Sequence, residues 1–93
     1  MAEPGGVTDV QITFKLFASL REYLPRECRV DNQLAIDVPE GTAVQAVIDR
    51  FNMPAALVHL VLVNGTYVPP DQRSHHLLRD RDELAVWPPI AGG

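Results

Sequence analysis

The last seven residues, Trp87–Gly93 (WPPIAGG), carry the groups with the clearest chemical use. Pro88 and Pro89 lack an amide donor and hold φ at about −65°, so they cannot continue a sheet ladder and direct the chain away from a domain. Gly92 and Gly93 have no Cβ, which lets them pass through a narrow channel toward a buried reactive centre. The sequence therefore predicts a projecting tail whose Gly93 α-carboxylate is the reacting group.

The two terminal glycines also have an ordinary interpretation. At an average glycine usage of about 7%, such an ending arises by chance in about one chain in 200, and frayed or cloned ends carry glycine as well. The tail chemistry therefore depends on whether the rest of the chain predicts a domain that could deliver the tail to a partner.

Other chemistry-bearing residues give weaker signals. Cys28, His59, His75 and His76 are zinc-ligand types, but no pair has the usual ligand spacing, and adjacent residues of an extended chain point to opposite sides. There is also no Gly-rich phosphate loop, nucleophile motif or acid–base pair. We therefore expect no metal site, no bound cofactor and no active site of the chain's own, with the histidines in a solvated loop and Cys28 structural or incidental.

Composition and charge narrow the function further. Eight basic against twelve acidic residues give a net charge of −4, which provides no field to attract nucleic acid. Residues 1–9 lack the apolar segment of a secretory signal, and Ala55–Val63 is about half the ~20 residues that a membrane-spanning helix needs. We expect a cytoplasmic protein that binds neither nucleic acid nor membrane. The acidic balance either suits a basic protein partner or only keeps the domain soluble.

The pattern of apolar residues divides the chain into a flexible leader (1–9), one domain (10–88) and the reactive tail (89–93). Period-two alternation predicts strands over 10–16 and 34–38, with a short helical turn over 17–23 between them. Val44, Val47, Ile48 and Phe51 recur at helical spacing, and Thr42 with Gln45 three residues on suggests a capping box.

The second half of the domain predicts more strands. Asn64-Gly65 between two apolar runs favours a hairpin over 60–68, because both residues tolerate positive φ. Asp80–Asp82 forms a turn before a last strand over 83–87. Two strands, a helix and further strands in this order predict an α+β fold, in which one main helix packs on one face of a mixed sheet.

These motifs together resemble the MoaD/ThiS family of ubiquitin-like sulfur carriers, across about residues 10–93. The resemblance rests on FASLRE (17–22), LVNG (62–65), DEL (82–84) and above all PPIAGG (88–93), which is most similar to the molybdopterin synthase small subunit. It implies a β-grasp fold with a protruding Gly-Gly tail.

The resemblance also implies a mechanism. A ubiquitin-activating-like adenylyltransferase uses ATP and magnesium to adenylate Gly93, and sulfur from a persulfide donor then gives a thiocarboxylate. The tail next enters the larger subunit of an acceptor synthase, in molybdopterin (molybdenum cofactor) biosynthesis. Gly92 and Ala91 thread the channel, while Ile90, Pro89, Pro88 and Trp87 contact the partner.

Several points stay open at this stage. Trp87 is either a docking residue or part of the core. Asp80, Asp82 and Glu83 either contact a basic partner or form a solvated turn. Arg81 stands where the family usually has glycine, so it carries a local cost if the turn needs positive φ. The alternatives for function are a carrier for thiamine or another pathway, conjugation to lysine, and a ubiquitin-like interaction module that is never activated.

Overall fold

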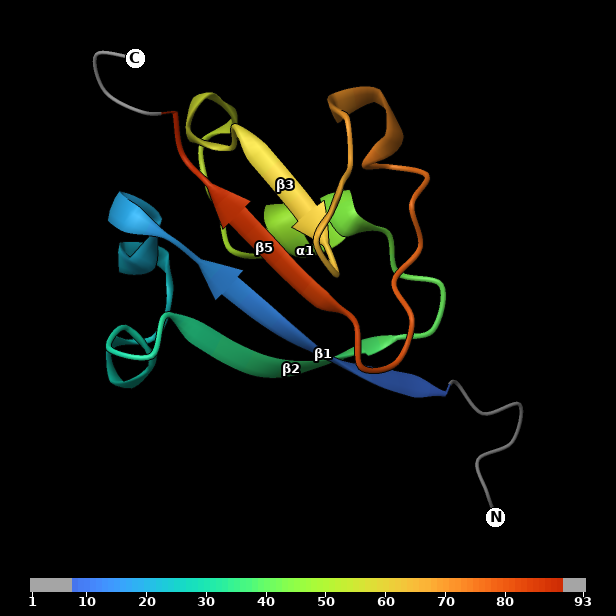
Figure 1. Ribbon diagram of the computed structural model, residues 1–93. Coiled ribbons are helices and arrows are strands. Elements are labelled where there is room, and N and C mark those ends of the chain that lie inside the picture. The colour runs from blue at the N-terminus through green and yellow to red at the C-terminus, as the bar shows by residue number, and fades with distance from the viewer. Residues whose placement is uncertain (1–7, 90–93) are drawn as a thin grey trace.

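A computed structural model describes residues 8–89 and shows one mixed sheet with a helix behind it (Figure 1). The strand order is β2-β1-β5-β3-β4, in which β1 and β5 are parallel and the other neighbours are antiparallel. The strands are β1 Asp9–Leu16, β2 Gln33–Pro39, β3 Leu60–Val63, β4 Thr66–Tyr67 and β5 Glu83–Trp87. The helix is α1 Val44–Arg50, and four 3-10 turns are η1 Ala18–Tyr23, η2 Arg26–Cys28, η3 Ala55–Leu57 and η4 Pro70–Gln72.

Alternation along β1 divides its side chains between the two faces of the sheet. Val10, Ile12, Phe14 and Leu16 are buried, as predicted, in a core cluster that also contains residues of α1. β2 pairs with β1 over seven residues and buries Ile36 and Val38 on the same side. The expected strand pair is therefore confirmed, and β1 begins at Asp9, one residue before the expected domain boundary.

Helix α1 is where predicted, but the predicted capping box is wrong. The Thr42 hydroxyl donates to the Pro39 carbonyl at 2.6 Å, and no side chain caps the helix at Ala43. The first-turn amides of Val44 and Gln45 instead donate to carbonyls of the loop after β4, each at 2.9 Å. A long-range contact thus replaces the local cap, because any nearby carbonyl can satisfy these amides.

The hydrophobic core lies between the sheet and helix α1. Val44, Val47 and Ile48 face the sheet, and the rings of Phe14 and Phe51 lie 4.6 Å apart. Cys28 is half-buried and packs against the cluster of buried apolar side chains that forms the core, in agreement with a structural role. Within residues 8–89, none of the helices has the length and apolarity needed to cross a membrane.

Two turns set the β3–β4–β5 register. Asn64 and Gly65 have φ of 51° and 84°, which confirms the predicted hairpin turn. Arg81 has φ of 71°, so the position that usually holds glycine does adopt the left-handed region here. The expected local strain is therefore present at Arg81.

Candidate functional site

The structure describes the root of the tail, while Ile90, Ala91, Gly92 and Gly93 lie outside the described residues. The root is the end of β5, a central strand held by β1 on one side and β3 on the other. The Val86 carbonyl accepts from the Phe17 amide at 3.2 Å, and the Trp87 carbonyl accepts from the His59 amide at 3.0 Å. The tail therefore starts from a firmly bonded position in the sheet.

The two prolines behave differently. Pro88 is buried in the isolated chain, whereas Pro89 is exposed. Both were expected to lead the chain away from the domain, but Pro88 still belongs to the packed body, and the chain reaches the surface at Pro89. Their predicted contact with a partner stays a prediction.

Trp87 is half-buried and lies outside the core cluster. Its ring stacks on Phe17, with ring centroids 4.0 Å apart and planes 1° from parallel. The sequence places Phe17 in a predicted turn and in the FASLRE motif, but gives it no role in the site. The signal that could have found it is the alternation of β1, because Phe17 follows buried Leu16 and so falls on the side of the sheet away from α1.

This aromatic pair extends into an apolar strip. Leu60 pairs with Trp87, while Leu62 pairs with Ala85 on one side and with Tyr67 on the other. Directly paired residues point to the same face of a sheet, and their neighbours in β3 and β5 face α1, so these side chains lie on the open face. We call the following residues the open-face strip: Phe17, Leu60, Leu62, Tyr67, Ala85 and Trp87.

The open-face strip runs from the tail root to the edge of the sheet. Figure 1 shows α1 behind β3 and β5, on the opposite side from the viewer. Tyr67 is 51% exposed, and Leu60, Leu62 and Trp87 are half-buried. Aromatic and aliphatic side chains that lie together on a sheet face are typical of a protein-binding surface. The strip and the tail root could therefore engage the same partner.

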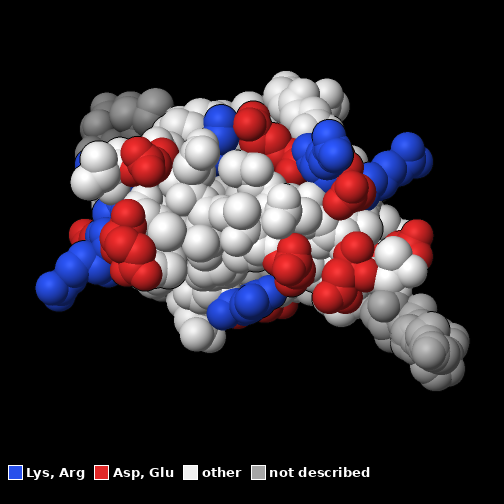
Figure 2. All heavy atoms as spheres, turned by 90° about the horizontal axis from the view of Figure 1, so that it is seen from below, with Lys and Arg blue, Asp and Glu red and all other residues white. Residues whose placement is uncertain are grey.

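On the face seen in Figure 2, the charged side chains of the described residues do not form one dominant patch. Figure 2 shows acidic and basic side chains interspersed around the margin of a largely uncharged region. On the sheet, the Lys15 ammonium lies 2.9 Å from a Glu83 carboxylate oxygen, both partly exposed. This distribution favours shape and apolar contact over long-range charge in partner binding.

The family of the chain follows from sequence comparison. The sequence model of the ThiS family matches residues 14–93. The chain belongs to the ThiS family. No curated protein matches its sequence.

Solved structures similar to this ThiS-family chain establish the fold. SAMP1 from Haloferax volcanii has a TM-score of 0.64 at 23% identity, with 89% of this chain and 99% of that chain covered. A putative molybdopterin converting factor, subunit 1, from Pyrococcus furiosus gives 0.63 at 23%, covering 87% and 99%. Small archaeal modifier protein 1 from Methanosarcina acetivorans gives 0.63 at 21%, covering 92% and 99%. The predicted ubiquitin-like β-grasp fold is confirmed.

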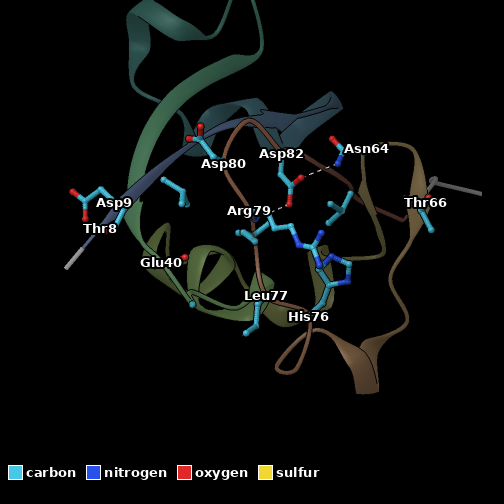
Figure 3. Close-up of a pocket in the computed structure, with 14 residues that line it drawn as sticks. Thr8, Asp9, Glu40, Asn64, Thr66, His76, Leu77, Arg79, Asp80 and Asp82 are labelled. Carbon is cyan, nitrogen blue, oxygen red and sulfur yellow. Dashed lines mark hydrogen bonds between the residues drawn. The ribbon is translucent and has the colours of Figure 1, made fainter. Parts of the chain in front are cut away.

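A hollow lies at the other end of β5, where the strand begins. It has a volume of about 1040 Å³ between the β3–β4 turn, the start of β1 and the loop leading to β5 (Figure 3). Asp82 accepts from the Asn64 side chain and the Arg79 amide, both at 2.8 Å, and Asp80 accepts from the Gln11 amide at 2.8 Å. Asp82 therefore bonds to the β3–β4 turn and to its own loop, and Asp80 bonds to strand β1, so both carboxylates have partners within the domain, which favours the turn interpretation of Asp80 and Asp82.

The histidines do not add a second centre. His75 is exposed, and His76 borders the hollow beside Arg79 (Figure 3). Within residues 8–89, no three His, Cys, Asp or Glu side chains are grouped in a way that could hold a metal ion. The tail root with the open-face strip is therefore the candidate site of this ThiS-family chain.

Proposed function

We propose that this chain is a sulfur carrier whose Gly93 carboxylate is activated and converted to a thiocarboxylate. The observation that carries the proposal is the family match, which runs through residue 93 and so includes the Gly-Gly ending. The tail root supports it, because a tail that starts from a central strand can transmit the binding energy of the docked domain to the reacting group.

The chemistry needs partners, since the chain supplies the carboxylate and its placement. An adenylyltransferase similar to ubiquitin-activating enzymes would use ATP and magnesium to form the Gly93 acyl adenylate, releasing pyrophosphate. The terminal sulfur of a persulfide donor then displaces AMP, and thiol cleavage of the resulting S–S bond leaves the thiocarboxylate. The open-face strip provides the docking surface and the tail root provides orientation.

For the receiving pathway we propose molybdopterin biosynthesis. The PPIAGG ending resembles the molybdopterin synthase small subunit, and one similar structure is described as a putative molybdopterin converting factor subunit. The tail would enter the larger synthase subunit and deliver its sulfur there.

A second candidate is a ubiquitin-like modifier joined to lysine. It is favoured by the similarity to small archaeal modifier protein 1. The two functions share the acyl adenylate and differ in the nucleophile that follows, a sulfur in one case and a lysine amine in the other. Covalent adducts of the chain on other host proteins, lost on deletion of Gly93, would favour the modifier.

Deleting Gly93 tests the requirement for the tail. The natural adenylating enzyme can be fractionated from the host by assaying ATP–pyrophosphate exchange with the intact chain. With the chain that lacks Gly93, this enzyme should show no detectable exchange. A matched truncation of residues 1–7 should keep exchange within about twofold, because these residues precede β1 in the sequence and are not part of the Gly-Gly ending. Full exchange without Gly93 would contradict the proposal and favour an interaction module.

A further inference from the structure

Arg73 is a charged side chain in an unexpected place. Its exposed fraction is 6%, and it is the one charged residue that is buried among residues 8–89. Its Nε donates to the Val68 carbonyl at 3.1 Å and its Nη2 donates to the His59 carbonyl at 3.2 Å. Burying a guanidinium is costly unless its donors are matched, so these two carbonyls specify its position.

The contacts of Arg73 lead directly to the tail root. His59, whose carbonyl Arg73 binds, donates its own amide to the Trp87 carbonyl at 3.0 Å. The Arg73 carbonyl accepts from the Gln45 amide at 2.9 Å in the first turn of α1. One residue thus joins the helix, the end of the β3–β4 hairpin and the last backbone hydrogen bond before the tail.

We propose that Arg73 is a positioning residue for the reaction at Gly93, acting through His59 on the direction in which the tail leaves the domain. The proposal rests on the proposed function. Six residues follow Trp87, and a chain spans at most about 3.3–3.6 Å per residue, so a change of direction at the root changes the positions that the carboxylate can reach. Misplacing a reacting group by about 1 Å can cost about a hundredfold in rate.

Arg73→Met removes the two donors, and Arg73→Lys keeps the charge without the planar fork that reaches both carbonyls. Arg50→Met is the matched control, because it makes the same charge change on an exposed residue of α1. The measurements are kcat and KM for adenylation by the host enzyme, with amide hydrogen exchange at His59 compared with amides of the β1–β2 ladder.

We expect Arg73→Met to lower kcat about tenfold or more with KM within about twofold, because the open-face strip still docks. His59 exchange should rise about tenfold relative to the β1–β2 ladder. Arg73→Lys should lower kcat as Arg73→Met does, and Arg50→Met should resemble the natural chain. Unchanged kcat, or exchange that rises equally throughout the sheet, would overturn the proposal.

A second variant covers the case in which Arg73→Met does not fold. His59→Pro removes the amide that binds Trp87 and leaves the guanidinium intact, and it should lower kcat in the same way; normal kcat in this variant would also overturn the proposal. If the natural chain gives no adenylate, the proposed function fails, and His59 exchange still decides whether Arg73 fixes the tail root.

Discussion

The backbone angle φ of Arg81 lowers the stability of the folded domain. Its φ of 71° lies in the region that L-residues enter at a penalty of about 1–2 kcal/mol. Its side chain is 91% exposed, and the nearest Asp80 oxygen is 3.8 Å from its Nε, so the side chain gives little in return. The turn is kept because the Arg81 amide donates to the Gln11 carbonyl at 2.6 Å.

Arg81→Gly should therefore stabilise the domain. We expect about 0.5–1 kcal/mol, since the relief of strain exceeds the larger conformational entropy of glycine in the unfolded chain. This gain corresponds to a Tm increase of about 2–8 °C for a domain of this size, measurable by thermal unfolding.

Arg79→Gly is the matched control for Arg81→Gly. Arg79 is exposed in the same loop and is not among the positive-φ residues of the described chain. It should lower Tm. Equal destabilisation by both substitutions would show that φ at Arg81 is not the source of the cost.

Among the elements, the β3–β4 hairpin is held by both backbone and side chain at Asn64. Its φ is 51°, its side-chain amide donates to Asp82 at 2.8 Å, and its side-chain oxygen accepts from the Glu83 amide at 2.9 Å. Asn64 thus connects the hairpin turn to the start of β5.

Two substitutions separate these contributions. Asn64→Gly keeps the turn angle and loses two exposed hydrogen bonds, for which we expect a loss of about 1 kcal/mol in unfolding free energy. Asn64→Ala adds the cost of positive φ and should lose a further ~1 kcal/mol or more. Chemical denaturation measures both, and equal losses would mean that the backbone angle contributes nothing.

The elements themselves could be predicted from local patterns, and their connections could not. Alternation from Val10 to Leu16 predicts β1 because one face meets the helix, and Asn64-Gly65 predicts its own turn angles. Thr42 misled the cap prediction because the carbonyls that satisfy α1 come from Arg73 and His76, about thirty residues later in the sequence.

Some residues of the candidate site could be predicted from the sequence, and others could not. The ending from Pro88 to Gly93 points to tail chemistry by composition alone. Arg73 looks like any loop arginine, and its burial depends on three elements meeting around it. Pro88 has the stiffness of a residue that leaves a sheet, but tertiary packing buries it. Phe17 becomes part of the site only because β5 places Trp87 beside it.

At the scale of the whole molecule, the proposed function uses one part of the chain to dock a partner and another part, the tail, for the reaction. The open-face strip offers a surface for a partner, and the tail leaves the same sheet from the end of β5. Tyr67 is the most accessible large member of the strip and lies on the edge strand β4. It therefore tests docking with little disturbance of the core.

Tyr67→Asp should raise KM for the adenylating enzyme about tenfold or more and leave kcat within about twofold, because a charge placed in an apolar contact weakens binding without moving the tail. Ala46→Asp is the control, since it puts the same charge on the exposed side of α1. Steady-state kinetics give both values. An equal rise in KM for the two variants would show that the partner does not use the open face.

The central claim, that Gly93 carries sulfur, is tested most directly by the intact mass of the chain purified from its natural host without acid or reductant. Replacement of one carboxylate oxygen by sulfur adds about 16 Da, and we predict a species with this gain that disappears when Gly93 is deleted. An unmodified mass, even after incubation with the host adenylating enzyme, ATP, magnesium and a persulfide donor, would contradict the carrier function.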